Sequence, residues 1–213
     1  SFKYAAEPFF FSQAEDKNAP EVFARVMKWF LIVCTLMWVG ISLNLDLLAH
    51  LFLRNKIYHE GIGVVPWLLL GFLFLGVYYN LAAWFKITGK TEYGTYITLT
   101  GVCTTAFLNA LLVPRLGYLG CGVAFAGSAF LMMALCYYYG QRYYPVPYRA
   151  KEAVGYVSLA AAYVYLNTQL HFSSLLTAVL YHLLLFGLFV LVVLIFERHS
   201  MPLFLRRWLL RLP

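Results

Sequence analysis

The sequence predicts an all-α, polytopic transmembrane helix bundle with about six spans and the end of one more. Its composition is the first reason: 62% of the 213 residues are hydrophobic and only 12% are charged. Soluble domains carry about 45–50% apolar and about 25% charged residues, so a soluble domain is excluded. The second reason is that six apolar stretches approach the length of about 20 residues that a spanning helix needs.

These stretches place the spans at residues 26–48, 63–85, 95–113, 116–140, 153–167 and 173–196, the fifth being short for a full crossing. Before the first span, Asn18, Ala19, Pro20 and Glu21 are typical of a helix start, because proline suits the first turn and an acid suits the positive end of the helix dipole. After the third span, we expect Pro114 to end the helix and Gly117 to permit the reversal of the chain.

The basic residues alternate with the spans. Twelve lie before the first span, between spans two and three, between spans four and five, or after the sixth: Lys17, Arg25, Lys28, Lys86, Lys90, Arg142, Arg149, Lys151, Arg198, Arg206, Arg207 and Arg211. Three lie on the opposite side: Arg54, Lys56 and Arg115. By the positive-inside rule, both ends of the six-span block are cytoplasmic. Because the charges are dispersed, the net charge of +7 does not indicate nucleic-acid binding.

The chain divides into four predicted parts. Residues 1–17 are the end of a preceding transmembrane helix and a loop, and residues 18–143 form a four-helix unit. Pro145 and Pro147 make a stiff linker into residues 144–198, which hold two more spans, and residues 199–213 form an amphipathic tail on the cytoplasmic leaflet. The first residue is not Met and already lies in an apolar segment, so we expect a piece of a longer protein.

The fourth span opens with small residues: Gly120, Gly122, Ala124, Ala126, Gly127, Ser128 and Ala129. Helices in lipid associate through close packing more than through hydrophobicity. We therefore expect this face to contact neighbouring helices, and we interpret Ser128 as a packing residue rather than a nucleophile.

No catalytic or metal-binding constellation emerges from the sequence, and we expect no enzyme and no cofactor. Lys3 and Glu7 lie four residues apart in the opening segment. Such a pair is a modest helix-surface ion pair or, if it lies within the membrane, faces a bundle interior or watery cavity. Asn80 and Asn109 are expected to make polar contacts between helices, as is His182, for which a proton relay is the alternative.

Several motifs in order resemble bacterial polysaccharide flippases. They are residues 4–11 with Glu7 and Pro8, the helix opening at Val22 to Arg25, Val65 with Pro66, Tyr78 to Asn80, Thr88 to Thr91, and the run from Asn109 through Pro114 and Gly117 to Ala124. Each is weak alone, but their order and spacing cover nearly the whole chain. The family is the O-antigen and capsule flippases (Wzx type) of the multidrug/oligosaccharidyl-lipid/polysaccharide exporter superfamily.

The resemblance implies the C-terminal lobe of a MATE-like two-lobe transporter in the bacterial cytoplasmic (inner) membrane, which moves an undecaprenyl-diphosphate-linked oligosaccharide for surface polysaccharide synthesis. It implies membrane lipids and the missing N-terminal lobe as partners, and Lys3 and Glu7 as substrate-binding residues of the central cavity. One alternative is a drug/cation antiporter of the same superfamily. Another is a membrane-embedded glycan polymerase or ligase, which the short outer loops disfavour.

Overall fold

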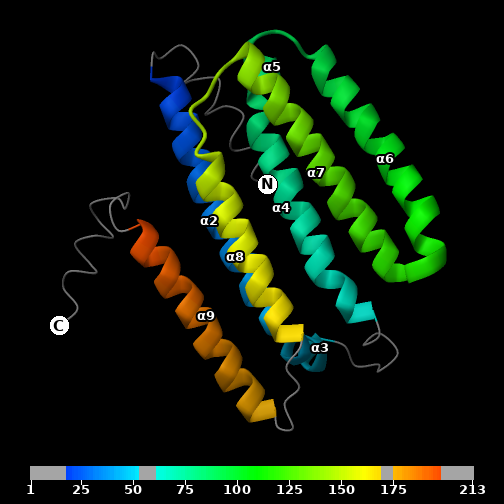
Figure 1. Ribbon diagram of the computed structural model, residues 1–213, viewed down its shortest axis with the longest axis vertical. Helices are drawn as coiled ribbons and strands as arrows, with labels where there is room; N and C mark the ends of the chain where they lie inside the picture. The colour runs from blue at the N-terminus through cyan, green and yellow to red at the C-terminus, as the bar shows by residue number, and fades with distance from the viewer. Residues whose placement is uncertain (1–17, 53–60, 169–174, 198–213) are drawn as a thin grey trace.

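The computed structural model describes residues 18–52, 61–168 and 175–197, and within these ranges every regular element is helical. The elements are α2 (Ala19–Leu43), α3 (Leu45–Phe52), α4 (Val65–Leu81), α5 (Ala83–Ile87), α6 (Glu92–Leu116), α7 (Tyr118–Tyr143), α8 (Ala150–Thr168) and α9 (Leu175–Glu197). The long helices run roughly side by side, with α4, α6 and α7 in one half and α2, α8 and α9 in the other (Figure 1). The all-α bundle predicted from the sequence is confirmed.

Five helices of the described ranges are long and apolar enough to cross a membrane: Ala19–Leu43, Gly61–Ile87, Glu92–Leu116, Tyr118–Tyr143 and Thr177–Glu197. They match five of the six predicted spans, so the chain is a multi-pass membrane protein. The sixth helix, α8, is 19 residues long but less apolar, because Lys151, Glu152 and Asn167 lie near its ends. It covers the fifth predicted span, residues 153–167, which is short for a full crossing.

The start of α2 agrees with the sequence, since Pro20 and Glu21 occupy its first turn. The first predicted span is wrong in one respect: it is not a single helix, because α2 ends at Leu43 and α3 begins at Leu45. At the break, the Asn44 side chain donates a hydrogen bond of 2.9 Å from Nδ2 to the carbonyl of Gly40. Asparagine competes for backbone groups in this way, which favours a helix end.

The expectation that Pro114 ends the third helix is also wrong. Pro114 lies inside α6, which continues to Leu116. Proline removes one backbone donor and crowds the preceding turn, and only two residues of α6 follow it. The reversal occurs at Gly117, as predicted, where φ is +58° and α7 begins one residue later.

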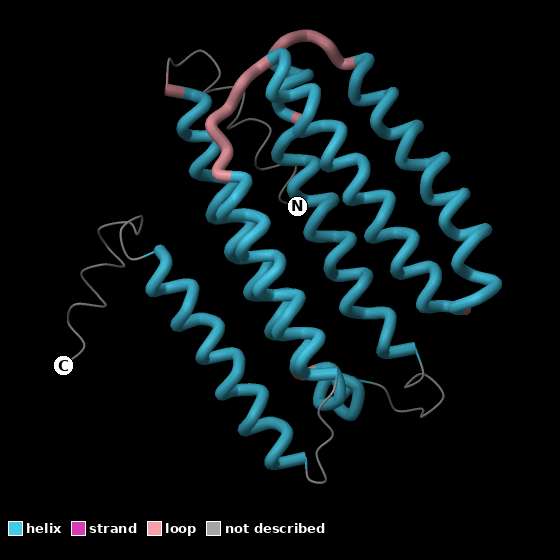
Figure 2. Tube along the Cα trace, in the orientation of Figure 1, coloured by secondary structure: helices cyan, strands magenta, loops and turns pink. Residues whose placement is uncertain are grey.

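The chain between α7 and α8 has no regular secondary structure, and Figure 2 draws it as a loop. It does not stand away from the bundle. Val146 is buried against Ala19 and Phe23 at the start of α2. Gln141 donates a hydrogen bond of 2.8 Å from Nε2 to the backbone carbonyl of Val146. This packing places the beginning of α8 beside α2.

A candidate ionic cluster and groove

Five side chains from three parts of the chain meet at one end of the bundle and form what we call the ionic cluster: Lys28, Arg149, Glu152, Tyr156 and Glu197. Lys28 Nζ lies 2.6 Å from Glu197 Oε2 and 3.4 Å from Glu152 Oε2. The Tyr156 hydroxyl donates a hydrogen bond of 2.6 Å to Glu197 Oε1. Arg149 Nη1 lies 3.0 Å from Glu152 Oε1.

The three ion pairs of the cluster differ in burial, from the innermost, Lys28 with Glu197, to the outermost, Arg149 with Glu152. The Glu197 side chain is 3% exposed and Lys28 is 16% exposed, whereas Arg149 and Glu152 are 63% and 42% exposed. A buried carboxylate is costly unless it is paired and hydrogen-bonded, and Glu197 has both a cation and a hydroxyl donor. The pair of Lys28 and Glu197 therefore fixes α9 to α2, while the pair of Arg149 and Glu152 lies at the surface.

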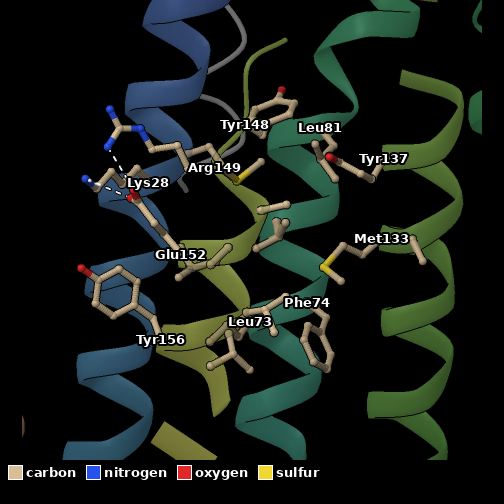
Figure 3. Close-up of a pocket in the computed structure, with 18 of the residues that line it drawn as sticks. Lys28, Leu73, Phe74, Leu81, Met133, Tyr137, Tyr148, Arg149, Glu152 and Tyr156 are labelled. Carbon is tan, nitrogen blue, oxygen red and sulfur yellow. Dashed lines mark hydrogen bonds and ion pairs between the residues drawn. The ribbon is translucent and has the colours of Figure 1, made fainter. Parts of the chain in front are cut away.

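Directly beside the cluster, α2, α4, α7 and α8 enclose a groove of about 480 Å³. Figure 3 shows Lys28, Arg149 and Glu152 at one end of it and apolar side chains such as Leu73, Phe74 and Met133 along it. A volume of this size lies within the range of about 300–1,000 Å³ that is usual for ligand sites. The groove is therefore apolar along its length and charged at one end.

Tyr148, in the linker, also lines the groove (Figure 3). Burial raises the pKa of its hydroxyl above the ordinary tyrosine value. Removal from water disfavours the phenolate, so Tyr148 is a neutral hydrogen-bonding group at physiological pH.

Of the site residues that the sequence put forward, the structure describes Asn80, Asn109 and His182, and none of these three belongs to the ionic cluster or lines the groove. Lys3 and Glu7 fall outside the described residues, as does the predicted amphipathic tail. Asn80 is buried in α4, and its Nδ2 donates to the carbonyl of Gly76 at 3.1 Å, while its Oδ1 is buried without a hydrogen-bond partner. Asn109 donates from Nδ2 to the carbonyl of Thr105 at 2.9 Å. Both bonds stay within the helix of origin and do not cross to another, because the carbonyl four residues back is the nearest acceptor in lipid.

His182 is buried on the inner face of α9, with 4% of its surface exposed. It shares this face with Phe189, Val193 and Glu197, which are also buried and recur at helical spacing. The proton relay stays a prediction.

Sequence reasoning missed the ionic cluster. Its members lie up to 169 positions apart, from Lys28 to Glu197, so no local motif joins them. A signal was present in Glu197, a lone acid that ends a helix otherwise almost wholly apolar. An ionisable residue in such a helix is expected to have a partner within the bundle.

The MatE family model matches residues 10–111. This is a little under half of the chain, and it covers α2 to α5 and most of α6. No curated protein and no solved structure matches the chain. The MatE match supports the multidrug/oligosaccharidyl-lipid/polysaccharide exporter superfamily, in which MatE proteins are membrane transporters.

Proposed function

We propose that this chain is the C-terminal part of a transporter that moves undecaprenyl-diphosphate-linked oligosaccharide across the bacterial cytoplasmic membrane. The observation that carries the transporter assignment is the MatE match across α2 to α6, in a chain with five membrane-spanning candidates. The choice of a lipid-linked oligosaccharide is supported by the sequence motifs that resemble polysaccharide flippases, among them Glu7 with Pro8 and Pro114 with Gly117.

The proposed mechanism is alternating access. The sugar and diphosphate are too polar to enter hydrocarbon, so a watery cavity between two lobes would hold them while the polyprenyl tail stays in the bilayer. In this proposal Lys3 attracts the diphosphate, and Glu7 sets the charge state of Lys3 or carries a coupling proton. The missing N-terminal lobe supplies the other wall of the cavity.

Rocking of one lobe against another requires each lobe to move as a unit. The ionic cluster supports this for the part described, because it ties α2, α8 and α9 together at one end. We therefore assign Lys28 and Glu197 a positioning role and no contact with the transported group.

A drug/cation antiporter of the same superfamily agrees equally well with the MatE match. The two functions differ in what a null strain loses. Loss of surface polysaccharide with unchanged drug resistance supports the flippase, and loss of drug resistance with intact polysaccharide supports the antiporter.

The site is tested by Lys3→Glu in the full-length protein, with Lys17→Glu as the matched control. Reversing the charge at Lys3 should abolish surface polysaccharide because it would repel the diphosphate, while the control should leave it unchanged. Normal polysaccharide in a strain that expresses Lys3→Glu at the normal level would exclude this role for Lys3.

A further inference from the structure

We propose that the groove between α2, α4, α7 and α8 binds a membrane phospholipid whose headgroup carries both a phosphate and a primary ammonium. The headgroup would lie at the exposed pair of Arg149 and Glu152, and one acyl chain would lie along the apolar wall. This proposal uses neither Lys3 nor Glu7 and does not depend on which solute is transported.

The apolar wall fits a hydrocarbon chain. Away from its charged end the groove is lined almost entirely by aliphatic, aromatic and methionine side chains of α2, α4, α7 and α8. It reaches the outside of the bundle at Phe130 and Tyr137 of α7 and Val154 of α8, which line it and are all exposed. A lipid can therefore enter from the side, without crossing the helix layer.

The charged end fits a phosphate and an ammonium together. Arg149 Nη1 and Glu152 Oε1 lie 3.0 Å apart at the surface, with 63% and 42% of the side chains exposed. An exposed ion pair contributes little to stability, so Arg149 can separate from Glu152 around a ligand, while Glu152 Oε2 stays 3.4 Å from Lys28. The Arg149 guanidinium would donate to the phosphate, and the ammonium would donate to the Glu152 carboxylate, both as charge-assisted hydrogen bonds.

The charge balance decides which headgroup fits best. Lys28 Nζ lies 2.6 Å from the buried Glu197 and 3.4 Å from Glu152, and the two cations and two anions of the cluster balance. Matching Lys28 to the closer carboxylate, Glu197, leaves Arg149 with Glu152. The remaining pair offers one cation and one anion, which matches a zwitterion. A headgroup with only negative charge would be repelled by Glu152, and a diphosphate would be repelled more strongly. A quaternary ammonium has no N–H to donate to Glu152 and would bind more weakly than a primary one.

The test is native mass spectrometry of the full-length protein in detergent with three lipids of identical acyl chains: phosphatidylethanolamine, phosphatidylcholine and phosphatidylglycerol. Phosphatidylethanolamine should bind on the order of tenfold more tightly than phosphatidylcholine, since one hydrogen bond to a charged group separates them. In Glu152→Gln, the affinities for phosphatidylethanolamine and phosphatidylcholine should differ by no more than about twofold. Arg149→Gln should lower the affinity for phosphatidylethanolamine by a factor of about ten.

Lys151→Gln is the matched control, because Lys151 is exposed on the same helix turn but does not line the groove. It should leave all three affinities unchanged. Ala153→Phe, which places a ring in the groove, should lower the binding of all three lipids, and its thermal melting shows whether the bundle is intact. Arg149→Gln and Glu152→Gln change exposed side chains and test the proposal even if Ala153→Phe fails to fold.

Three results would overturn the proposal. Equal binding of phosphatidylethanolamine and phosphatidylcholine would remove the role of Glu152, and preferred binding of phosphatidylglycerol would show an anion site. Absence of any lipid adduct on the full-length protein would show that another part of the polypeptide fills the groove. An effect of Lys151→Gln as large as that of Glu152→Gln would reduce the effect to general surface charge.

Discussion

The half of the bundle made by α4, α6 and α7 is held together differently from the half made by α2, α8 and α9. In the first half, glycines let backbones approach: a Cβ added at Gly120 would lie 2.7 Å from the Leu112 carbonyl carbon of α6, and one at Gly122 would lie 2.5 Å from Val64 Cγ2. In the second half, Gly155 and Gly187 have nothing within 4 Å of an added Cβ, and one at Gly40 of α2 would approach only the Phe186 side chain of α9, at 3.1 Å. There the ionic cluster supplies the specific contacts at one end.

This difference reflects two ways in which helices associate where water offers no driving force. Close packing of small residues spreads many weak dispersion contacts along the helices. An ion pair such as Lys28 with Glu197 concentrates the attraction at one point, and its strength grows as the surroundings become less polar. The first arrangement is sensitive to added volume and the second to lost charge, which makes the comparison testable.

The largest effect is expected for Gly120→Leu. The new side chain would collide with the backbone of α6, which cannot rotate away, so we expect a loss of about 3 kcal/mol in the free energy of unfolding. Denaturation in mixed detergent micelles measures it. The matched control is Gly155→Leu, which has open space around it and should change stability by less than about 0.5 kcal/mol. Equal losses in the two variants would contradict the packing account.

The next effect is expected for Lys28→Met, which leaves the buried Glu197 carboxylate without its cation. Removing one partner of a buried pair costs about 3–5 kcal/mol, and we expect about 2 to 3 kcal/mol here because Lys28 is 16% exposed. Hydrogen exchange should rise mainly in α9. The double variant Lys28→Met with Glu197→Leu should recover most of the loss, since an apolar pair needs no cation. Failure of the double variant to recover would mean that Lys28 acts through packing.

A smaller effect is expected for Tyr156→Phe. This change removes the 2.6 Å hydrogen bond to Glu197 Oε1 but keeps the ring and the pairing with Lys28. We expect a loss of about 1.5 kcal/mol, typical of a hydrogen bond to a charged group. Tyr165→Phe on the exposed face of α8 is the control and should leave the free energy of unfolding unchanged. A loss at Tyr156 no greater than at Tyr165 would show that the hydroxyl does not hold α9.

The smallest effect is expected for Arg149→Gln. Its ion pair with Glu152 is exposed, so the free energy of unfolding should change by no more than about 0.5 kcal/mol. Thermal unfolding of the purified protein measures it. A loss comparable to that of Lys28→Met would mean that the surface pair, and not the buried pair, secures this end of the bundle.

The features that the sequence predicted correctly are local ones. Helix length, apolar character and turn chemistry depend on neighbouring residues, so the spans, the helix start at Pro20 and the reversal at Gly117 could be read from short windows. The small-residue face of α7 was likewise visible, and Gly120 and Gly122 do lie in helix contacts. The errors at Asn44 and Pro114 are also local, and concern only where a helix stops.

Contacts between helices could not be predicted from short stretches of sequence. Nothing in the residues around Lys28 indicates that its partners are Glu152 and Glu197, because that depends on how the linker at Val146 packs onto α2. The groove has the same origin, since its wall combines four elements that are distant in the chain. The primary structure specified which segments cross the membrane. Which charges meet, and what space they border, follows from the packing of those segments, because side chains far apart in sequence interact only once the bundle has formed.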